Sequence, residues 1–558
     1  MHKLKQISSI IFRYQVKYYL VLVSCLLSLA ACKRNPTTWA DDLVAPLATG
    51  SLTLGNLFPD TVIKTNPADS SLMIAFTTNL INYQIDSLLK IPDTTIVSKD
   101  TINFTYPITT SGEFNLFTSP PANNSYSFPN GIQLTKAIVK RGKVKIQLYN
   151  SYRQPLLYEY QLASATKGGV MLDTIFKIPG GSFTNPGTTI CYMNLAGYTI
   201  DFTGLTHNTT NTIAQGGTLS TAPNAQADTM FSNEGLRAYF TFQGIIPQYA
   251  LGYFGSQTIT VGPDTTSFNV FNSIKKGILN LNSASVNLTV SNQFGVAMKA
   301  DISNISSINT NNPSVVTLTH TAVPLNNLQI NQAYDNNGPT NPVVSVSPAV
   351  KSITLNNSNS NVAAFIGNLP GRLSYKLTAQ INPPIGGGGG NISLNNDFGY
   401  YGTTFSANLT MNVPLYFSAS NLMLADTVSM DLSGVNQLQN INKGNLILTA
   451  TNSYPFSINL VATLLDANKQ SLGSLLSSPS LIQVPALDAA TGKVIAPLKS
   501  KLYIPLTPQK ISALQKAKYV TYTATFNTAN QPNTQVKFYS NYTLDLLLTA
   551  DVNYTVGK

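Results

Sequence analysis

Three stretches of the chain share one pattern of eleven residues, and this pattern limits the fold more than any other feature. Each stretch begins with a small residue and then alternates apolar and polar side chains. Its last three positions are Asn, a variable residue and an aromatic residue. Strict alternation with a period of two is typical of a β-strand that buries one face. The pattern predicts equivalent strands in three related units. The stretches are GKVKIQLYNSY (142–152), ASVNLTVSNQF (284–294) and GNLILTATNSY (444–454).

The Asn of each copy (Asn150, Asn292 and Asn452) indicates a turn at the end of the strand. An Asn side chain bonds nearby backbone groups and tolerates left-handed conformations. A second apolar stretch follows each turn, and the copies begin 142 and 160 residues apart. This spacing is close to the length of one domain. We therefore expect an all-β protein, an elongated array of about three β-sandwich units with few short helices.

The succession of strand, Asn, aromatic and second strand resembles the LEA-type (WHy) β-sandwich modules. That resemblance implies sandwich units similar in shape to immunoglobulin and fibronectin type III domains. One helix is predicted near the end of the chain, in TPQKISALQKA (507–517). Thr507 is placed as its N-cap and Pro508 as its first helical residue.

The segment LVLVSCLLSLAACKRNP (20–36) near the start of the chain follows basic residues, and its apolar run from Leu20 to Ala31 is only 12 residues long. This run is shorter than the ~20 residues that a membrane-spanning helix needs, and it predicts a secretory signal. Its ending, Leu-Ala-Ala-Cys, resembles the lipobox of bacterial lipoproteins. The resemblance implies cleavage before Cys32 and lipidation of Cys32, which anchors the chain to a membrane. The alternative is an ordinary signal peptide followed by an unmodified cysteine.

These observations predict the following division of the chain. We expect a lipoprotein signal peptide (1–31), a lipidated lead with short strands (32–125), and three β-sandwich units (126–265, 266–425 and 426–558).

The composition excludes several classes of protein. The 34 basic and 23 acidic residues are spread along the chain without a block of like charges, so we expect no nucleic-acid partner. Of the three cysteines, Cys25 leaves with the signal and Cys32 is the anchor, so Cys191 has no partner for a disulfide. We expect Cys191 to be a buried, small apolar residue.

Catalytic and cofactor motifs are not found in the sequence. His207 and His320 have no second ligand at metal-binding spacing. The pentaglycine run Gly386–Gly390 lacks the Lys-Ser/Thr that completes a phosphate loop. We therefore expect no enzyme, no cofactor and no metal site, although a carboxylate pair distant in sequence stays an open alternative.

Aromatic residues gather in two segments and allow two interpretations. If exposed, they form an interface patch or a stacking platform for sugars; if buried, they belong to a sandwich core. The candidate interface aromatics are Tyr249, Tyr253, Phe254, Tyr400 and Tyr401.

Two longer stretches (Trp39–Asp60 and Phe242–Ile259) resemble large uncharacterised outer-membrane lipoproteins of Bacteroidota. The leading hypothesis is a non-catalytic outer-membrane lipoprotein that binds or scaffolds an envelope complex through an outer-membrane protein partner. The alternatives are a surface-exposed lipoprotein that binds glycans or cells, and a lipid-handling envelope protein. Lys33 and Arg34 follow Cys32, where surface-exported lipoproteins of Bacteroidota commonly carry acids. This basic pair favours the periplasm-facing leaflet.

Overall fold

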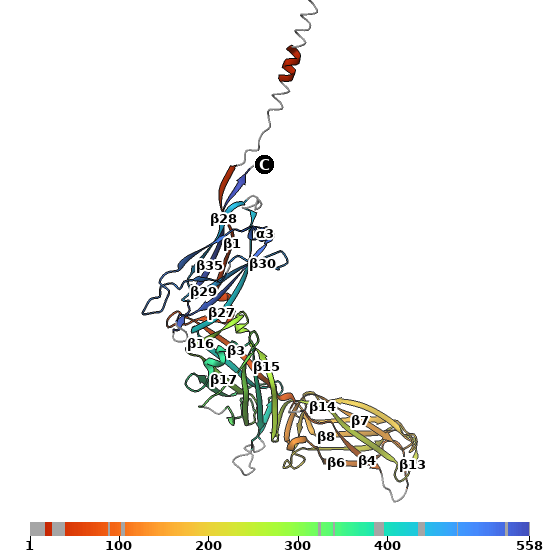
Figure 1. Cartoon of the computed structure of the whole chain (residues 1–558). Coiled ribbons are helices and arrows are strands. Elements are labelled where there is room, and N and C mark those ends of the chain that lie inside the picture. Colours follow the sequence, from red (N-terminus) through yellow and green to blue (C-terminus); the bar gives the residue numbers. More distant parts are fainter. Residues whose placement is uncertain are drawn as a thin grey trace, which may run out of the picture. The chain divides into compact units, whose positions relative to one another are not determined.

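The computed structural model describes residues 17–24, 39–87, 90–101, 107–321, 325–338, 341–383, 396–433, 441–476, 478–529 and 534–556. Its strands are joined mainly by antiparallel pairing, which confirms the predicted all-β class. Two compact units are present (Figure 1). A terminal unit contains residues 1–57 and 419–558, and an inserted unit contains residues 58–418. Within the described ranges, no helix has the length and apolar character required to span a membrane.

Each of the three sequence copies becomes a strand inside a β-sandwich. We call the sandwiches modules 1, 2 and 3 after the order of these copies. Modules 1 and 2 belong to the inserted unit, and module 3 belongs to the terminal unit. The repeated strands are β7 (Gln133–Asn150), β17 (Ser285–Asn292) and β28 (Ile441–Asn452).

The sheet that contains the repeated strand, here named the repeat sheet, has one strand order in all three modules. The first strand of the module pairs with its last strand, the last strand pairs with the repeated strand, and a later strand pairs on the far side. In module 1 the order is β4 (Thr94–Thr101), β14 (Gly235–Tyr253), β7 and β10 (Gly187–Asn194). In module 2 it is β3 (Leu72–Gln84), β26 (Thr404–Pro414), β17 and β23 (Ala349–Asn356). In module 3 it is β1 (Trp39–Thr53), β35 (Thr543–Val556), β28 and β32 (Leu498–Pro505).

The opposite sheets also follow one order. Module 1 has β6 (Asn115–Ser125), β12 (Thr212–Thr221), β8 (Leu156–Lys167) and β9 (Val170–Ile178). Module 2 has β15 (Gln257–Ser267), β24 (Arg372–Ile381), β18 (Met298–Asn309) and β19 (Ser314–Thr317). Module 3 has β27 (Tyr416–Ser429), β33 (Tyr519–Asn527), β29 (Ser457–Leu465) and β30 (Ser471–Ser474). In module 1, β11 (Thr199–Asp201) pairs with both β7 and β8 and joins the two sheets.

The modules are nested along the chain rather than placed one after another. Their first strands appear in the order β1, β3, β4, and their closing strands appear in the reverse order, β14, β26, β35. The structure therefore differs from the expected lead (32–125) and from the three expected units (126–265, 266–425 and 426–558). The strands of the lead complete the modules, because each first strand finds its hydrogen-bonding partner in a closing strand far along the chain.

The repeated Asn makes the same three hydrogen bonds in every module. Its Oδ1 accepts from the backbone N–H of the aromatic two residues on, over 2.8 Å for Asn150 and 2.9 Å for Asn292 and Asn452. Its Nδ2 donates, each time over 2.9 Å, to the carbonyl four residues on and to a carbonyl of a later loop. All three Asn residues are fully buried, and so are the aromatics Tyr152, Phe294 and Tyr454. The repeated Asn thus satisfies buried backbone groups at the turn between the two sheets.

Short helices have equivalent places in modules 2 and 3. The helix α2 (Val362–Gly367) lies between β23 and β24, and α3 (Pro508–Lys516) lies between β32 and β33. The predicted start of α3 is confirmed, because the Thr507 side chain accepts a hydrogen bond from the backbone N–H of Lys510 over 3.3 Å. The pentaglycine run lies outside the described residues.

Candidate binding face of module 1

The expected interface aromatics do not form an exposed platform. Tyr249, Phe254 and Tyr400 are buried, with 1%, 2% and 0% of their surface exposed, so the prediction of an interface is wrong for these three. Tyr253 and Tyr401 are half-buried. The Nζ of Lys140 lies 3.1 Å from the centre of the Tyr401 ring, in a cation–π contact.

The burial has a simple cause in the strand pairing. β14 pairs with β25 (Asp397–Tyr400), and this places Tyr249 opposite Tyr400, with ring centres 4.8 Å apart. The Tyr400 hydroxyl donates to Asp335 Oδ1 over 2.9 Å. Burial raises the pKa of both phenols, and the Asp335 carboxylate raises the pKa of both further. These side chains form the core cluster that the alternative interpretation anticipated.

Aromatic side chains also lie on the solvent side of the repeat sheet of module 1, where Tyr149 and Tyr239 are half-buried and Tyr192 is exposed. The β7 side chains Val144, Ile146 and Leu148 are fully buried, so the side chains that alternate with them face outward. We call the outward positions of β7, β14 and β10 the outer face of module 1. The strand register arranges them in four rows of β14, β7 and β10 residues: Arg237, Tyr149, Thr188; Tyr239, Gln147, Ile190; Thr241, Lys145, Tyr192; and Gln243, Lys143, Asn194.

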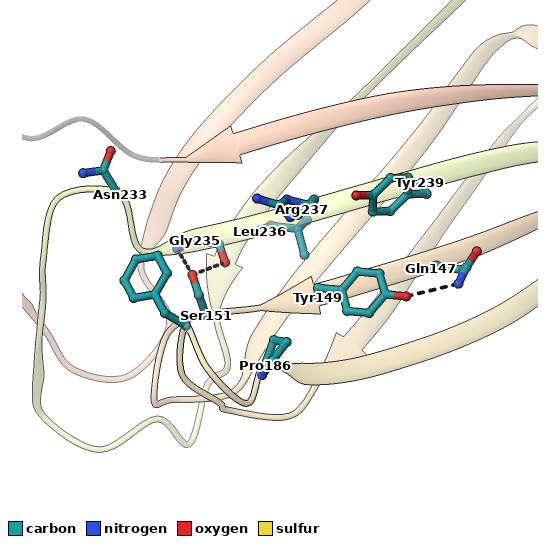
Figure 2. Close-up of a pocket in the computed structure, with 10 residues that line it drawn as sticks. Gln147, Tyr149, Ser151, Pro186, Asn233, Gly235, Leu236, Arg237 and Tyr239 are labelled. Atoms are coloured by element: carbon teal, nitrogen blue, oxygen red, sulfur yellow. Dashed lines mark hydrogen bonds between the residues drawn. The ribbon is translucent and has the colours of Figure 1, made fainter.

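A hollow of about 360 Å³ marks one end of this face (Figure 2). Tyr149 and Tyr239 line it from adjacent strands, with ring centres 5.9 Å apart in an edge-to-face arrangement. Gln147 Nε2 donates to the Tyr149 hydroxyl over 3.1 Å, and Arg237 lies in the same lining. Phe183, which is 64% exposed, comes from the loop before β10. The hollow therefore combines aromatic rings with amide and guanidinium donors.

A second hollow of about 370 Å³ lies toward the other end of the same face. Its lining includes Lys143, Gln243, Asn194 and Tyr192. The Nζ of Lys143 lies 4.5 Å from the centre of the Tyr192 ring, which is 57% exposed. Tyr149 and Lys143 are six residues apart on β7, so the two hollows are about 20 Å apart.

The charge of the outer face is of one sign. Its four rows contain Lys143, Lys145 and Arg237, and these rows contain no Asp or Glu. Two carboxylates lie at the ends of the face. Asp93 accepts from the backbone N–H of Gly244, and Glu234 is buried, where it accepts from the backbone N–H of Phe231. The face is thus suited to a ligand that carries negative charge.

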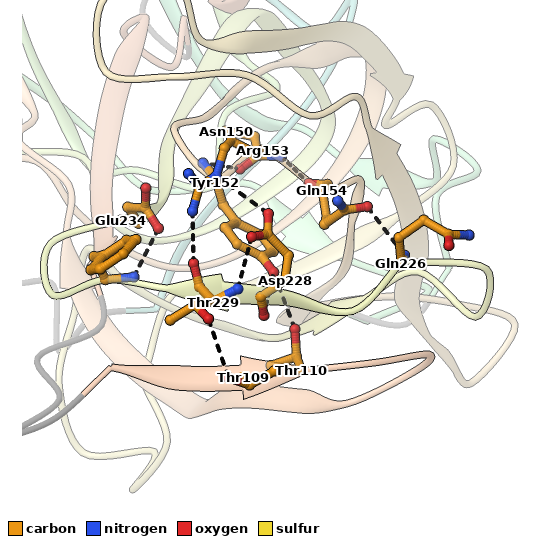
Figure 3. A network of polar contacts seen from close by, with 11 residues as sticks. Thr109, Thr110, Asn150, Tyr152, Arg153, Gln154, Gln226, Asp228, Thr229 and Glu234 are labelled. Atoms are coloured by element: carbon orange, nitrogen blue, oxygen red, sulfur yellow. Dashed lines mark hydrogen bonds and ion pairs between the residues drawn. The ribbon is translucent and has the colours of Figure 1, made fainter.

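A polar network supports the loops beside the first hollow (Figure 3). The Tyr152 hydroxyl lies 3.1 Å from Thr110 Oγ1. Arg153 donates to the Thr229 carbonyl over 2.9 Å and forms an ion pair with Asp228 at 3.3 Å. These contacts hold the two-stranded sheet of β5 (Ile108–Thr110) and β13 (Asp228–Met230) against the end of the module. The described partners are all internal, which indicates a structural role.

The titratable residues noted in the sequence lie outside the outer face or are not described. His207 is exposed, with its Nδ1 3.0 Å from Asp201 Oδ2. His320 forms an isolated backbone bridge with Ser360. Cys191 is half-buried on β10, and burial raises the pKa of its thiol. Over the part of the chain that the structure describes, no three His, Cys, Asp or Glu side chains are grouped to hold a metal ion. Cys32 lies outside the described residues.

No known protein family and no curated protein matches the chain. Among solved structures, it is similar to "a putative secreted protein" from Parabacteroides distasonis, with 9% identity over 92% of this chain and 99% of that chain and a TM-score of 0.32. It is also similar to a chain in the structure of Sulfolobus Turreted Icosahedral Virus, with 10% identity over 91% and 90% of the two chains and a TM-score of 0.09. TM-scores of this size carry no argument, so the outer face is interpreted from its own residues.

Proposed function

We propose that this chain is a non-catalytic, lipid-anchored envelope protein that binds its ligand through the outer face of module 1. The observation that carries the proposal is that the outer face of module 1 combines Tyr, Lys and Arg side chains with no Asp or Glu in its four rows. The equivalent face of module 3 has Tyr503, Lys499 and Lys501, but its rows also contain the acidic Asp545 and Asp551. Aromatic and Arg side chains are enriched where proteins bind their partners. Modules 2 and 3 belong to the framework of the chain in this proposal.

The membrane location in this proposal comes from the sequence. The signal that ends at Ala31 directs export, and acylation of Cys32 supplies the anchor. The basic pair Lys33 and Arg34 favours the periplasm-facing leaflet of the outer membrane. Protease treatment of intact cells tests this part, since a periplasmic chain stays intact and a surface-exposed chain is cut.

A second candidate is docking on an outer-membrane protein, and exposed residues in loops support it. Phe114, Phe183 and Phe231 are 44%, 64% and 47% exposed and lie in loops of module 1. Exposed large apolar side chains in loops are a common feature of protein interfaces. This candidate predicts that the loops, and not the sheet face, determine binding.

A retention experiment separates the two candidates. The full chain, tagged at Lys558 and kept in mild detergent, is incubated with an envelope fraction, and the bound material is quantified. Under the proposal, the double variant Tyr149→Ala/Tyr239→Ala loses retention, while Thr289→Ala/Asn408→Ala on the equivalent face of module 2 keeps it. Equal retention by both variants would contradict the proposal. Loss with Phe114→Ser/Phe231→Ser alone would favour docking through the loops, because neither residue lines the hollow at Tyr149.

A further inference from the structure

We propose that the ligand of the outer face is an acidic oligosaccharide that lies along β7 from the hollow at Tyr149 to the hollow at Tyr192. This inference rests on the proposed function and adds the chemical class of the ligand. Three features carry it, namely the rings that line the two hollows, the one-signed charge of the face and the distance between the hollows.

The rings provide flat apolar surfaces at both ends of the face. Tyr149 and Tyr239 line the first hollow, and Tyr192 lines the second. Pockets that bind small polar molecules combine aromatic surface with a few placed donors. The C–H faces of sugar rings pack on such aromatic surface, while their hydroxyls take hydrogen bonds from Gln147 and Asn194.

The cations lie in the same rows as the rings or in adjacent rows. Lys145 lies between Thr241 and Tyr192 in its row, and Arg237 lies beside Tyr149. Arg offers paired N–H donors that match a carboxylate or sulfate, and Lys offers a point charge. Since the four rows contain no carboxylate, these cations are available to an anionic ligand. A neutral sugar would form no ion pair with these Lys and Arg side chains.

The same residues disfavour a protein as the occupant. The core of a protein interface is depleted in Lys, but here Lys145 lies in an inner row of the face, between Thr241 and Tyr192. The separation of about 20 Å between the hollows also exceeds what a single sugar covers, so a chain of sugars is required to reach both.

The test is direct binding to the full chain in mild detergent. The probes are an oligogalacturonate, a neutral malto-oligosaccharide of equal length, a poly-glutamate peptide and a single-stranded DNA oligonucleotide. We expect the oligogalacturonate to bind most tightly, with an affinity that falls as salt rises. Tyr192→Ala and Tyr149→Ala should each weaken it roughly tenfold, and Tyr192→Phe should keep it, because the ring is retained.

Several outcomes would overturn this assignment. They are equal binding of the neutral sugar, tighter binding of poly-glutamate or DNA, and no effect of the Tyr192→Ala and Tyr149→Ala changes. Thermal unfolding of each variant shows that the fold is kept, and Thr289→Ala is the matched control in module 2. If no oligosaccharide binds but retention of envelope material still depends on Tyr149 and Tyr239, the ligand class is wrong and the proposed function stands. If retention is independent of both residues, the proposed function is wrong as well.

Discussion

The repeat sheets of modules 1 and 2 share strand order and pairing, yet their solvent faces differ completely in chemistry. With Asn150 and Asn292 aligned, Tyr149 corresponds to Ser291 and Lys145 to Asn287. The module 2 face consists largely of Thr, Asn and Ser side chains that bond one another. Examples are Thr77 with Thr410 at 3.1 Å, Asn79 with Asn408 at 3.0 Å and Thr289 with Ser352 at 3.3 Å.

This difference separates what builds the fold from what is available for binding. The inward side chains and the buried Asn are the same in kind in both modules, so they account for the shared architecture. On the outward positions of the three central strands, module 1 has rings and positive charges that module 2 lacks. The four predictions below test whether framework and surface are independent, beginning with the largest effect.

The largest effect is expected from removing the repeated Asn. Asn150→Ala and Asn292→Ala each delete three hydrogen bonds and leave buried backbone groups unpaired. Each change should therefore lower the free energy of unfolding by about 3 kcal/mol or more. Hydrogen exchange measures the loss separately for β7 with β8 and for β17 with β18. Equal losses of stability in modules 1 and 2 would show that the Asn has the same structural role in both. If one of the two variants lost no stability, the modules would not be equivalent. The control is Asn115→Ala on β6, which should change the free energy of unfolding little because Asn115 is exposed.

The next effect concerns the surface alone. Replacing module 1 residues by their module 2 counterparts, in Tyr149→Ser/Lys145→Asn, should weaken ligand binding by roughly tenfold or more. The free energy of unfolding should change only by about 0.5 kcal/mol, because both positions are on the solvent side of the sheet. Binding and denaturant titrations on the same samples check both statements. A large loss of stability would mean that surface and framework are coupled.

Alkaline pH should destabilise the inserted unit through its buried phenols. The pKa of Tyr249 and of Tyr400 is raised above the ordinary value of 10.0. Their contribution to stability is therefore fully present below pH 10 and is lost as the pH rises from 10 toward the folded-state values, since only the unfolded chain ionises there. Urea unfolding at pH 8 and pH 11 measures the loss. Tyr400→Phe should reduce this pH dependence, and an unchanged dependence would contradict the assignment.

The smallest effect compares the aromatics that follow the repeated Asn. The Tyr454 hydroxyl donates to the Leu52 carbonyl over 3.1 Å, whereas Phe294 has no hydroxyl. Tyr454→Phe should therefore lower the free energy of unfolding by about 1 kcal/mol in module 3. Phe294→Tyr should not raise the free energy of unfolding in module 2. Thermal unfolding of the two variants tests this. A stabilised Phe294→Tyr would show that module 2 contains an acceptor at the equivalent place.

The sequence analysis succeeded where the information is local. Alternation around Asn150, Asn292 and Asn452 predicted the strands and their turns, and Thr507 predicted the start of α3. The pairing of β1 with β35 joins residues about as far apart as the chain allows, and no local pattern reports it. The nesting was therefore missed.

The candidate site shows the same limit. Tyr249 and Tyr400 drew attention because aromatics crowd their segments, but whether a strand residue is buried depends on what its strand pairs with and what packs on it. The outward positions of β7, from Lys143 to Tyr149, already follow from its alternation. What the sequence lacked was the register that brings Tyr239 and Tyr192 beside them.

The nested order of strands also sets a schedule for folding during synthesis and export. β1 is synthesised before the strands of modules 1 and 2 but cannot pair until β35 is synthesised, whereas module 1 has all of its strands once β14 is made. An unpaired strand edge can pair with a wrong strand during this interval. Module 3, which contains β1, is therefore completed last, and a chain that stops early retains module 1 while it loses module 3 first and module 2 next.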